Sequence, residues 1–472
     1  MAEQVATIET RSIDYVPESE RHGKVWQQGP FWFLGNFQFF TITIGFIGPA
    51  FGLSILHTVL AGTLGILFGT LFMAFHATQG PHLGLPQMIQ SRAQLGYRGV
   101  VIALFGSFVT FMLFNVVDVI LISGGLNGIF GWGDLAVAIV VTVVAAVLAI
   151  YGHDLLHRIF RLLFWVALPF YVILTIAIIT GNAGGAPAPA GEFTWVGFAA
   201  MFTAAAAYNI TYAPYVSDYS RYLPRTTPTT PIVLSVFLGA AGSAVWLIAL
   251  GAWLSASLGA TDALVSLRDA GDTVFGGLGS LLAILSVLAL VATMGINAYS
   301  AMLSTVTAFD SVATIQPTRN LRVFVIVVLA VIWAAVGISF GGDAVGALFN
   351  SLIFMLYLIV PWTAINLVDY FFVRRGRYAI TDLATPRGIY GAWGARGLIS
   401  YAVGLLAMIP FFVVPGVFTG PLAEALGGVD ISAIVGLVVS GGAYFLQTRS
   451  LDRGAEEPAI AESERRLAAE RP

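Results

Sequence analysis

The residue with the most chemical consequence is an aspartate inside a long apolar stretch. Asp118 lies in the sequence FMLFNVVDVILIS, and Phe114 precedes it by four residues. Because residues four apart share one helix face, a ring and a carboxylate are presented together. A ring can stack on a flat heterocycle, and a carboxylate accepts its N–H groups. Acids inside membrane helices usually line transport pathways. The alternative is an aspartate that is hydrogen-bonded between helices or wet near the outer surface.

A second apolar stretch is interrupted near its middle by polar and aromatic residues. They are Tyr208, Asn209, Thr211 and Tyr212, followed by Pro214. Proline breaks a helix, and a membrane helix can break only where protein or a water-filled cavity satisfies the freed backbone. Such breaks mark substrate sites in transporters, often at matching positions of two repeats.

The first apolar stretch is weakened in the same way. It contains Gly35, Gly45, Gly48, Pro49 and Gly52. The two interrupted stretches are five spans apart, as an inverted repeat of five helices requires. The alternative is that glycine and proline are simply more frequent in membrane helices. We favour a site, because polar and aromatic residues gather at mid-depth in both stretches.

Polar side chains also recur at helical spacing in a later stretch. Thr293, Asn297, Ser300 and Ser304 are about four residues apart and share one face. Asn297 offers a donor and an acceptor, as the edges of nucleobases require. The alternative is polar packing between helices, which is common in membranes.

A pair of histidines fits a different chemistry. His153 and His157 have the spacing of a zinc-binding helix, with Asp154 where the protease motif has glutamate. They define a remote alternative, a membrane-embedded metallohydrolase. No third ligand is evident, and two histidines at a helix end are usually solvated. We therefore expect no catalytic residues and no enzyme activity.

All of these residues must be positioned by helices in lipid. Of the 472 residues, 58% are hydrophobic and 10% are charged, against about 25% charged in an ordinary soluble domain. This composition excludes a soluble globular protein and a disordered chain. The absence of cysteine excludes disulfides and cysteine-based metal sites. The chain has no basic tract, so nucleic acid is not an expected partner.

Twelve stretches approach the length of about 20 residues that crosses a bilayer. They are 31–54, 57–79, 99–123, 135–152, 160–181, 195–215, 231–256, 277–302, 321–340, 346–373, 398–416 and 430–447. The sequence thus predicts an all-α integral membrane protein. It has an N-terminal segment, 1–29, a transporter domain, 30–447, and a polar C-terminal tail, 448–472, which we expect to be mobile.

The basic residues predict the orientation. With the N-terminus inside, all of the 22 lysines and arginines except Arg268 fall in cytoplasmic segments. We therefore expect a multi-pass protein of the cell membrane (inner or plasma) with both termini cytoplasmic.

Four short motifs resemble the nucleobase–cation symporter-1 family, the group of purine–cytosine and hydantoin permeases. They lie at 34–54, 217–222, 297–300 and 361–378, in the order and on the spans where the family has them. The resemblance implies a leucine-transporter-like fold, in which two inverted five-helix repeats, about 30–181 and 195–373, are followed by two extra helices, about 398–447.

The resemblance also implies a substrate site between spans one, three, six and eight. Family members hold a flat heterocycle between aromatic residues of spans three and six and read its edge with amides. The corresponding positions here are Phe39, Phe114, Asp118, Asn209 and Asn297. Asn209 stands where relatives have an aromatic residue, so Tyr208 or Tyr212 is expected to supply the ring.

The cation site of the family maps to five further positions. They are Gly35, Gln38, Ala289, Ala292 and Thr293. Sodium is expected only there, and Ala292 replaces a hydroxyl that a hard cation would use. Because some relatives use protons, Asp118 is the alternative coupling group, and sodium and proton both stay open.

We therefore expect a secondary-active, cation-coupled importer of a nucleobase or related heterocycle: a purine, cytosine, uracil, allantoin or a hydantoin. The cation gradient drives the transport, which proceeds by alternating access and needs no cofactor. The alternative is a transporter of the same fold for another small solute, such as a vitamin or an amino acid. An amino-acid carboxylate would be repelled by Asp118.

Overall fold

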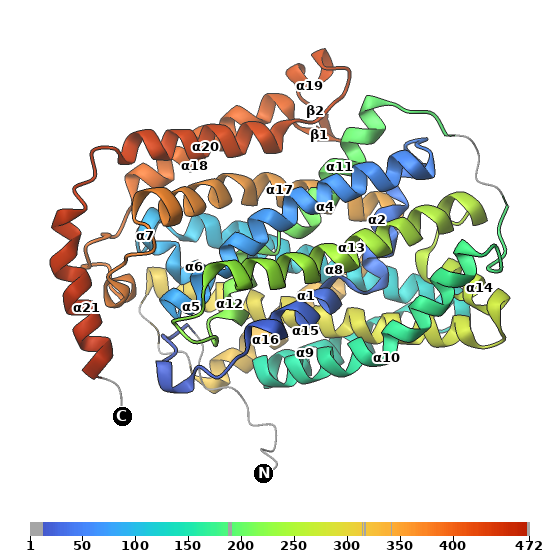
Figure 1. The fold of residues 1–472 in the computed structure, drawn as a ribbon, viewed down its shortest axis with the longest axis horizontal. Helices are drawn as coiled ribbons and strands as arrows, with labels where there is room; N and C mark the ends of the chain where they lie inside the picture. The colour runs from blue at the N-terminus through green and yellow to red at the C-terminus, as the bar shows by residue number, and fades with distance from the viewer. Residues whose placement is uncertain (1–12, 187–190, 314, 316–317, 341, 470–472) are drawn as a thin grey trace, which may run out of the picture.

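The protein is a bundle of long helices that run mostly along one axis (Figure 1). The computed structural model describes residues 13–186, 191–313, 315, 318–340 and 342–469. The long helices are α4 (Ile55–Ala77), α8 (Val101–Phe130), α9 (Asp134–Tyr151), α10 (His153–Ile179), α13 (Thr229–Leu258), α15 (Leu278–Val312), α16 (Arg319–Ser339) and α17 (Ala344–Val368).

Two spans are each divided into shorter helices. The first consists of α1 (Gln28–Asn36), α2 (Phe39–Gly45) and α3 (Ile47–Ala50), and another consists of α11 (Trp195–Ile210) and α12 (Ala213–Ser220). The remaining helices are α5 (Gln79–Leu83), α6 (Gln87–Gln90), α7 (Arg92–Leu95), α14 (Ala263–Val274), α18 (Ala395–Met408), α19 (Pro421–Ala425), α20 (Ser432–Thr448) and α21 (Glu457–Ala469).

Irregular elements occupy the ends of the bundle. A π-helix, η3 (Asp369–Val373), continues α17, and two short strands, β1 (Val413–Val414) and β2 (Phe418–Thr419), pair antiparallel beside α19. The 3-10 turns are η1 (Glu18–Glu20), η2 (Val25–Gln27), η4 (Ile380–Ala384), η5 (Ile409–Phe411) and η6 (Gly454–Glu456).

The helices are long and apolar enough for a membrane. Within the described residues, eight helices can cross a bilayer, and a ninth span results if the segments Val25–Asn36 and Phe39–Ala50, bent by 61°, count as one. The helices α18 and α20 are apolar but shorter. The expected all-α membrane architecture is thus confirmed at this level, and the count of twelve crossings stays a prediction.

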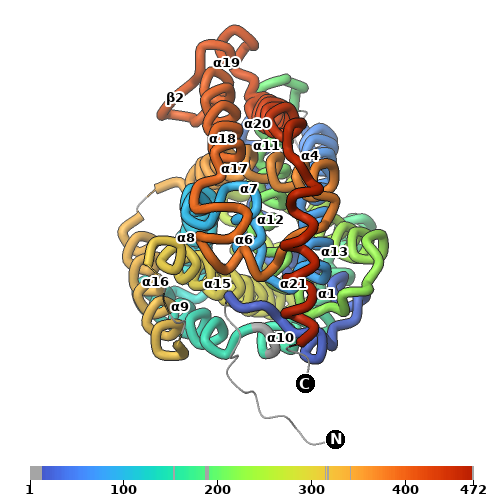
Figure 2. Tube along the Cα trace, turned by 90° about the vertical axis from the view of Figure 1, so that its left-hand side faces the viewer, coloured from blue at the N-terminus to red at the C-terminus, as the bar shows by residue number. Residues whose placement is uncertain are grey.

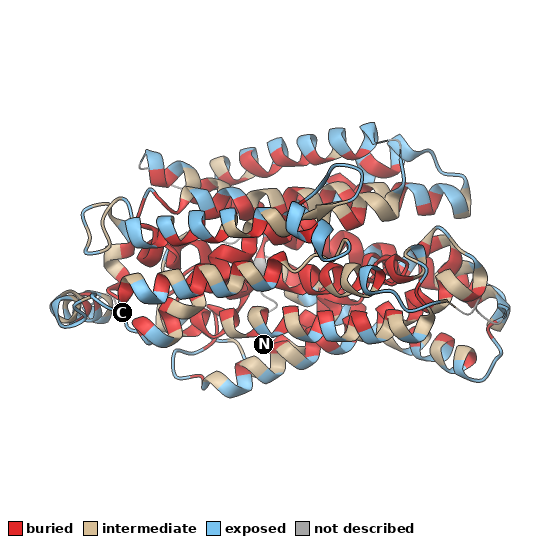
Figure 3. Ribbon diagram, turned by 90° about the horizontal axis from the view of Figure 1, so that it is seen from above, coloured by how far each residue is buried: buried red, intermediate tan, exposed pale blue. Residues whose placement is uncertain are grey.

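The outer surface of the bundle is apolar. Figure 3 shows buried residues along the inner faces of the helices and exposed residues along the outer faces. Large exposed side chains on outer faces include Ile139 and Val143 of α9 and Phe324 and Val331 of α16. Such a contiguous apolar surface is stable in lipid and not in water.

Small residues allow α4 to approach α11 closely. A Cβ added at Gly65 would lie 2.3 Å from the carbonyl oxygen of Phe202, and one at Gly69 would lie 2.2 Å from that of Ala206. No side chain fits at either glycine, because two backbones meet there. This contact places α11, and the break that follows it, in the interior of the bundle.

The C-terminal tail is a helix, so the expected mobility is wrong for 457–469. Figure 2 shows α21 lying across one end of the bundle. Ile460 and Ser463 are buried, and Ser463 Oγ accepts the backbone N–H of Thr381 at 3.0 Å. Contacts with the preceding loop order a segment whose composition alone predicts disorder.

Candidate functional site

The break in the first span is closed by side chains. Gln38 has an extended backbone, and its Oε1 accepts the N–H of Phe40 at 2.6 Å, which caps α2. Thr41 donates its hydroxyl to the carbonyl of Asn36, the last residue of α1, at 2.6 Å. The freed backbone groups are thereby satisfied without water, as a break inside a membrane requires.

The break between α11 and α12 is linked to the first one. Gln38 Nε2 donates to the hydroxyl of Tyr208 at 2.9 Å, and the same hydroxyl lies 2.8 Å from Thr41 Oγ1. Tyr212 donates its hydroxyl to the carbonyl of Gly35 at 3.3 Å. The interrupted spans predicted from the sequence therefore lie side by side.

The side-chain amide of Asn209 is engaged in hydrogen bonds between helices. Its Oδ1 accepts Asn36 Nδ2 at 2.9 Å, and its own Nδ2 donates to Thr70 Oγ1 at 2.6 Å. The amide therefore joins α11 to α1 and α4. The rings of its neighbours Tyr208 and Tyr212 both contact that of Phe114, and their role as the ring of this span stays a prediction.

Aromatic rings from three spans meet beside the breaks. The ring of Phe114 lies 5.5 Å from that of Phe40, 6.3 Å from Tyr208 and 5.8 Å from Tyr212. The rings of Phe40 and Tyr208 stack at 5.4 Å. These contacts put Phe114 next to both candidate rings of the sixth span, with the edges and faces that aromatic pairs prefer.

Asp118 lies in the same region. It is 1% exposed, and neither carboxylate oxygen has a hydrogen-bond partner within the described protein. It interacts electrostatically with Tyr208, Tyr212 and Tyr215, whose hydroxyl also lacks a partner there. A buried carboxylate without a partner is costly and must be neutralised by a donor, a cation or a proton.

Two asparagines on facing helices fix each other's direction. Asn115 of α8 donates Nδ2 to the carbonyl of Met294 at 3.3 Å, so its Oδ1 is free to accept. That Oδ1 accepts Nδ2 of Asn297 at 3.1 Å, and Asn297 Oδ1 is left buried without a partner. The pair therefore presents the acceptor oxygen of Asn297, because one N–H of each amide is used within the protein and this oxygen has no partner there.

The five candidate cation positions divide between two elements. Gly35 and Gln38 flank the break in the first span, and Ala289, Ala292 and Thr293 lie on α15, which packs against α1 and α2. The carbonyl of Gln38 accepts the N–H of Thr41 at 3.1 Å, and that of Ala289 accepts the hydroxyl of Thr293 at 3.1 Å. Carbonyl and hydroxyl oxygens are ligands that sodium uses.

Phe39 and the histidine pair stand apart from this cluster. Phe39 is buried, and its carbonyl accepts Thr43 Oγ1 at 2.9 Å, whereas the adjacent Phe40 contacts Phe114. The side chains of His153 and Asp154 lie outside the described residues. Within the described part, no three His, Asp or Glu residues are placed to hold a metal ion.

The site is closed to both ends of the bundle. Phe114, Asp118, Tyr208, Tyr212 and Asn297 are between 0% and 3% exposed. One cavity of about 490 Å³ lies at the end that carries the loop after α13, and another of about 280 Å³ lies beside α1 and α10 at the opposite end. The five side chains line neither cavity.

Three site residues were not selected from the sequence as binding residues: Phe40, Asn115 and Tyr215. A signal existed for Tyr215, because Tyr208, Tyr212 and Tyr215 follow a helical spacing. Asn115 directly follows Phe114 in α8, so its side chain points in another direction. Its contacts are made with the facing helix α15, and the sequence does not show them. The sequence does not show which of Phe39 and Phe40 points toward Phe114, because this depends on the rotation of α2 about its axis.

Two interrupted helices that lie side by side, next to buried polar groups without partners on α8 and α15, are typical of membrane transporters. A family model described as a permease for cytosine/purines, uracil, thiamine and allantoin matches residues 15–436. The chain belongs to the nucleobase–cation symporter-1 family, whose members are permeases and not enzymes.

Relatives and solved structures agree with this assignment. YxlA of Bacillus subtilis, named as a candidate purine-cytosine permease, is 34% identical over 446 residues, which cover 93% of this chain and 95% of that protein. The purine-cytosine permease fcyB of Emericella nidulans is 23% identical over 93% of this chain and 87% of its own. Mhp1, a nucleobase-cation-symport-1 transporter solved in a closed conformation with bromovinylhydantoin bound, matches with a TM-score of 0.72 at 16% identity, covering 96% of this chain and 100% of that one.

Proposed function

We propose that the protein is a cation-coupled importer of nucleobases, with a preference for bases that carry an exocyclic amino group. The observation that carries the proposal is the pair of buried acceptors without partners, Asp118 and Asn297 Oδ1, beside the rings of Phe114, Tyr208 and Tyr212. A flat ring that stacks and donates hydrogen bonds satisfies both features at once.

The preference follows from the balance of donors and acceptors. Asn297 presents an acceptor oxygen without a partner, while Asn115 holds one N–H of its amide, and an ionised Asp118 has acceptors alone. Cytosine presents an amino group where uracil presents a carbonyl oxygen. A carbonyl there would face acceptors and lose its hydrogen bonds to water without replacement, at a cost of about 1–3 kcal/mol.

The buried carboxylate also supports cation coupling. The buried carboxylate of Asp118 has no hydrogen-bond partner in the described protein. A substrate N–H or a nearby cation stabilises its charge, or a proton removes it. The free energy of this group therefore differs between the loaded and the empty states of the protein. Any ligand that binds one state better shifts the equilibrium between outward-open and inward-open forms. We assign sodium to the positions Gly35, Gln38, Ala289, Ala292 and Thr293, and Asp118 primarily to the substrate.

The proposed location is the cell membrane, with both termini in the cytoplasm. All lysines and arginines except Arg268 fall on that side by the predicted spans. Arg268 belongs to α14, beside Asp269, whose carboxylate lies 3.1 Å from its guanidinium. The positive-inside rule favours this orientation.

Uptake by purified protein in proteoliposomes tests the proposal. Radiolabelled cytosine is supplied with an inward sodium gradient, an inward proton gradient or no gradient. We expect accumulation above equilibrium with one of the gradients, and competition by excess cytosine or adenine that is at least tenfold stronger than competition by uracil or hypoxanthine.

Each comparison base differs from its partner by an amino group replaced with a carbonyl and by a proton on the adjacent ring nitrogen, so the donor and acceptor edge is reversed while ring size and stacking are matched. Equal competition within each pair would reject the acceptor argument, and equilibration without accumulation under both gradients would reject cation coupling. Accumulation of a radiolabelled amino acid or vitamin, with no uptake of radiolabelled cytosine, would support the alternative solute class.

A further inference from the structure

A second polar cavity lies outside the candidate site, where α21 meets the loop after α17. Its volume is about 430 Å³. It is lined chiefly by four arginines and two glutamates, Arg374, Arg375, Arg377, Arg453, Glu456 and Glu457. Positive charge is therefore in excess inside a concave site, which concentrates anions.

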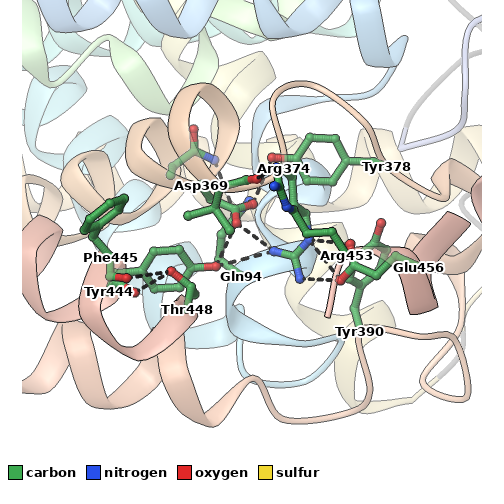
Figure 4. Close-up of polar contacts among 12 residues, drawn as sticks. Gln94, Asp369, Arg374, Tyr378, Tyr390, Tyr444, Phe445, Thr448, Arg453 and Glu456 are labelled. Carbon is green, nitrogen blue, oxygen red and sulfur yellow. Dashed lines mark hydrogen bonds and ion pairs between the residues drawn. The ribbon is translucent and has the colours of Figure 1, made fainter. Parts of the chain in front are cut away.

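The two glutamates are already engaged by two of the arginines. Arg374 donates to Glu456 from NH2 at 2.9 Å and from Nε at 3.0 Å, and Arg377 NH2 donates to Glu457 at 2.6 Å. Arg374 also donates to Asp369 at 2.7 Å, as Figure 4 shows. Neither glutamate is paired with Arg375 or Arg453.

The other two guanidinium groups retain donors for a ligand. Arg453 NH1 donates to the carbonyl of Val373 at 3.2 Å, a neutral partner that leaves its charge uncompensated. Arg375 is exposed, and within the described residues its side chain has neither a hydrogen bond nor an ion pair. Its φ of 53° lies in a region that residues other than glycine adopt rarely and that often marks ligand sites.

The surroundings fit a phosphate group near a membrane surface. The guanidinium fork matches the oxygens of a phosphate, and the N-terminus of α21, which begins at Glu457, adds a positive dipole end. Phe372, next to these arginines in the chain, is 64% exposed. Exposed aromatic residues near arginines are typical of the level of lipid headgroups.

We propose that this cavity is a binding site for a phosphate group, supplied by an anionic phospholipid headgroup or by a soluble phosphate. Arg375 and Arg453 are the residues that bind it. Arg374 connects the cavity to Asp369, which also accepts Gln94 at 2.7 Å and Tyr444 at 2.9 Å. An occupant thus contacts a network that joins α7, η3 and α20 (Figure 4).

Thermal unfolding of the full-length protein in detergent tests the site. One arm adds inorganic phosphate at constant ionic strength, and the other adds dioctanoyl phosphatidylglycerol, with dioctanoyl phosphatidylcholine as the chain-matched control. We expect a rise in melting temperature in at least one arm. The variant Arg375→Gln/Arg453→Gln should require at least tenfold more ligand for the same rise.

The control variant is Arg387→Gln, which removes an exposed arginine from the same loop and should respond as the wild type does. Nucleobase binding by each variant shows that the fold is intact. A response to inorganic phosphate identifies a soluble ligand, and a response to phosphatidylglycerol alone identifies the lipid. No response in either arm, or equal responses of the double variant and the wild type, would overturn the proposal.

Discussion

Asn297 donates its amide to Asn115 across the interface between α15 and α8, at 3.1 Å. Since Asn115 is itself directed by the carbonyl of Met294, the oxygen of Asn297 is the atom left for a ligand. One backbone carbonyl thereby sets the polarity of the edge that the site reads.

The substitution Asn297→Ala should weaken binding of cytosine about ten- to a hundredfold. It leaves ligand N–H groups without a partner, at a cost of about 1–3 kcal/mol. The dissociation constant measured by calorimetry or thermal shift checks this. Ser304→Ala, also buried on α15, is the matched control and should bind normally. Unchanged affinity in Asn297→Ala would move the polar reader to another residue.

The substitution Asn115→Ala should change selectivity more than affinity. Asn297 is then free to turn its amide and to offer either a donor or an acceptor. We expect the ratio of cytosine to uracil affinity to fall by about three- to tenfold, the worth of one hydrogen bond. Competition binding with both bases measures the ratio. A ratio equal to that of the wild type would show that Asn115 does not direct Asn297.

The substitution Phe114→Ala should lower affinity by about tenfold or more, because the stacking face is lost, whereas Phe114→Trp and Phe114→Tyr keep a π face and should bind well. Ligand titration of the three variants, with melting temperature as the measure of folding, separates stacking from packing. If alanine serves as well as tryptophan, Phe114 belongs to helix packing alone.

The substitution Asp118→Asn distinguishes a ligand reader from a proton carrier. If Asp118 binds the ligand, the variant replaces two acceptor oxygens by one acceptor and one donor group. Base preference should then change while sodium-driven accumulation persists. A proton carrier must instead titrate during each cycle, so uptake would rise as external pH falls and the variant would only exchange substrate. Uptake and counterflow at several pH values decide between the two roles, and we expect the reader.

The substitution Asn209→Ala should reduce stability rather than selectivity. It removes two buried hydrogen bonds, those to Asn36 and to Thr70, which costs about 1–3 kcal/mol. The melting temperature should fall, and the order of preference among the four bases should stay the same. Normal stability with altered base preference would return Asn209 to the ligand-binding residues.

The sequence by itself determined the features that depend on local chemistry. Apolar length places the spans, the glycines and Pro214 place the two breaks, and the spacing of four residues places Phe114 and Asp118 on one face. The motifs determined the family. These properties are set by neighbours along the chain, so no tertiary contact is needed to read them.

Only the tertiary structure decided which atoms meet. The rotation of α2 brings the ring of Phe40 against Phe114, and the packing of α11 on α4 brings the amide of Asn209 to Thr70. Gln38 and Tyr208 are 170 residues apart, yet share a hydrogen bond. The rotation of a helix and the direction of an amide are set by contacts with other helices. Each buried polar group needs a hydrogen-bond partner, and the tertiary structure determines which residue supplies it.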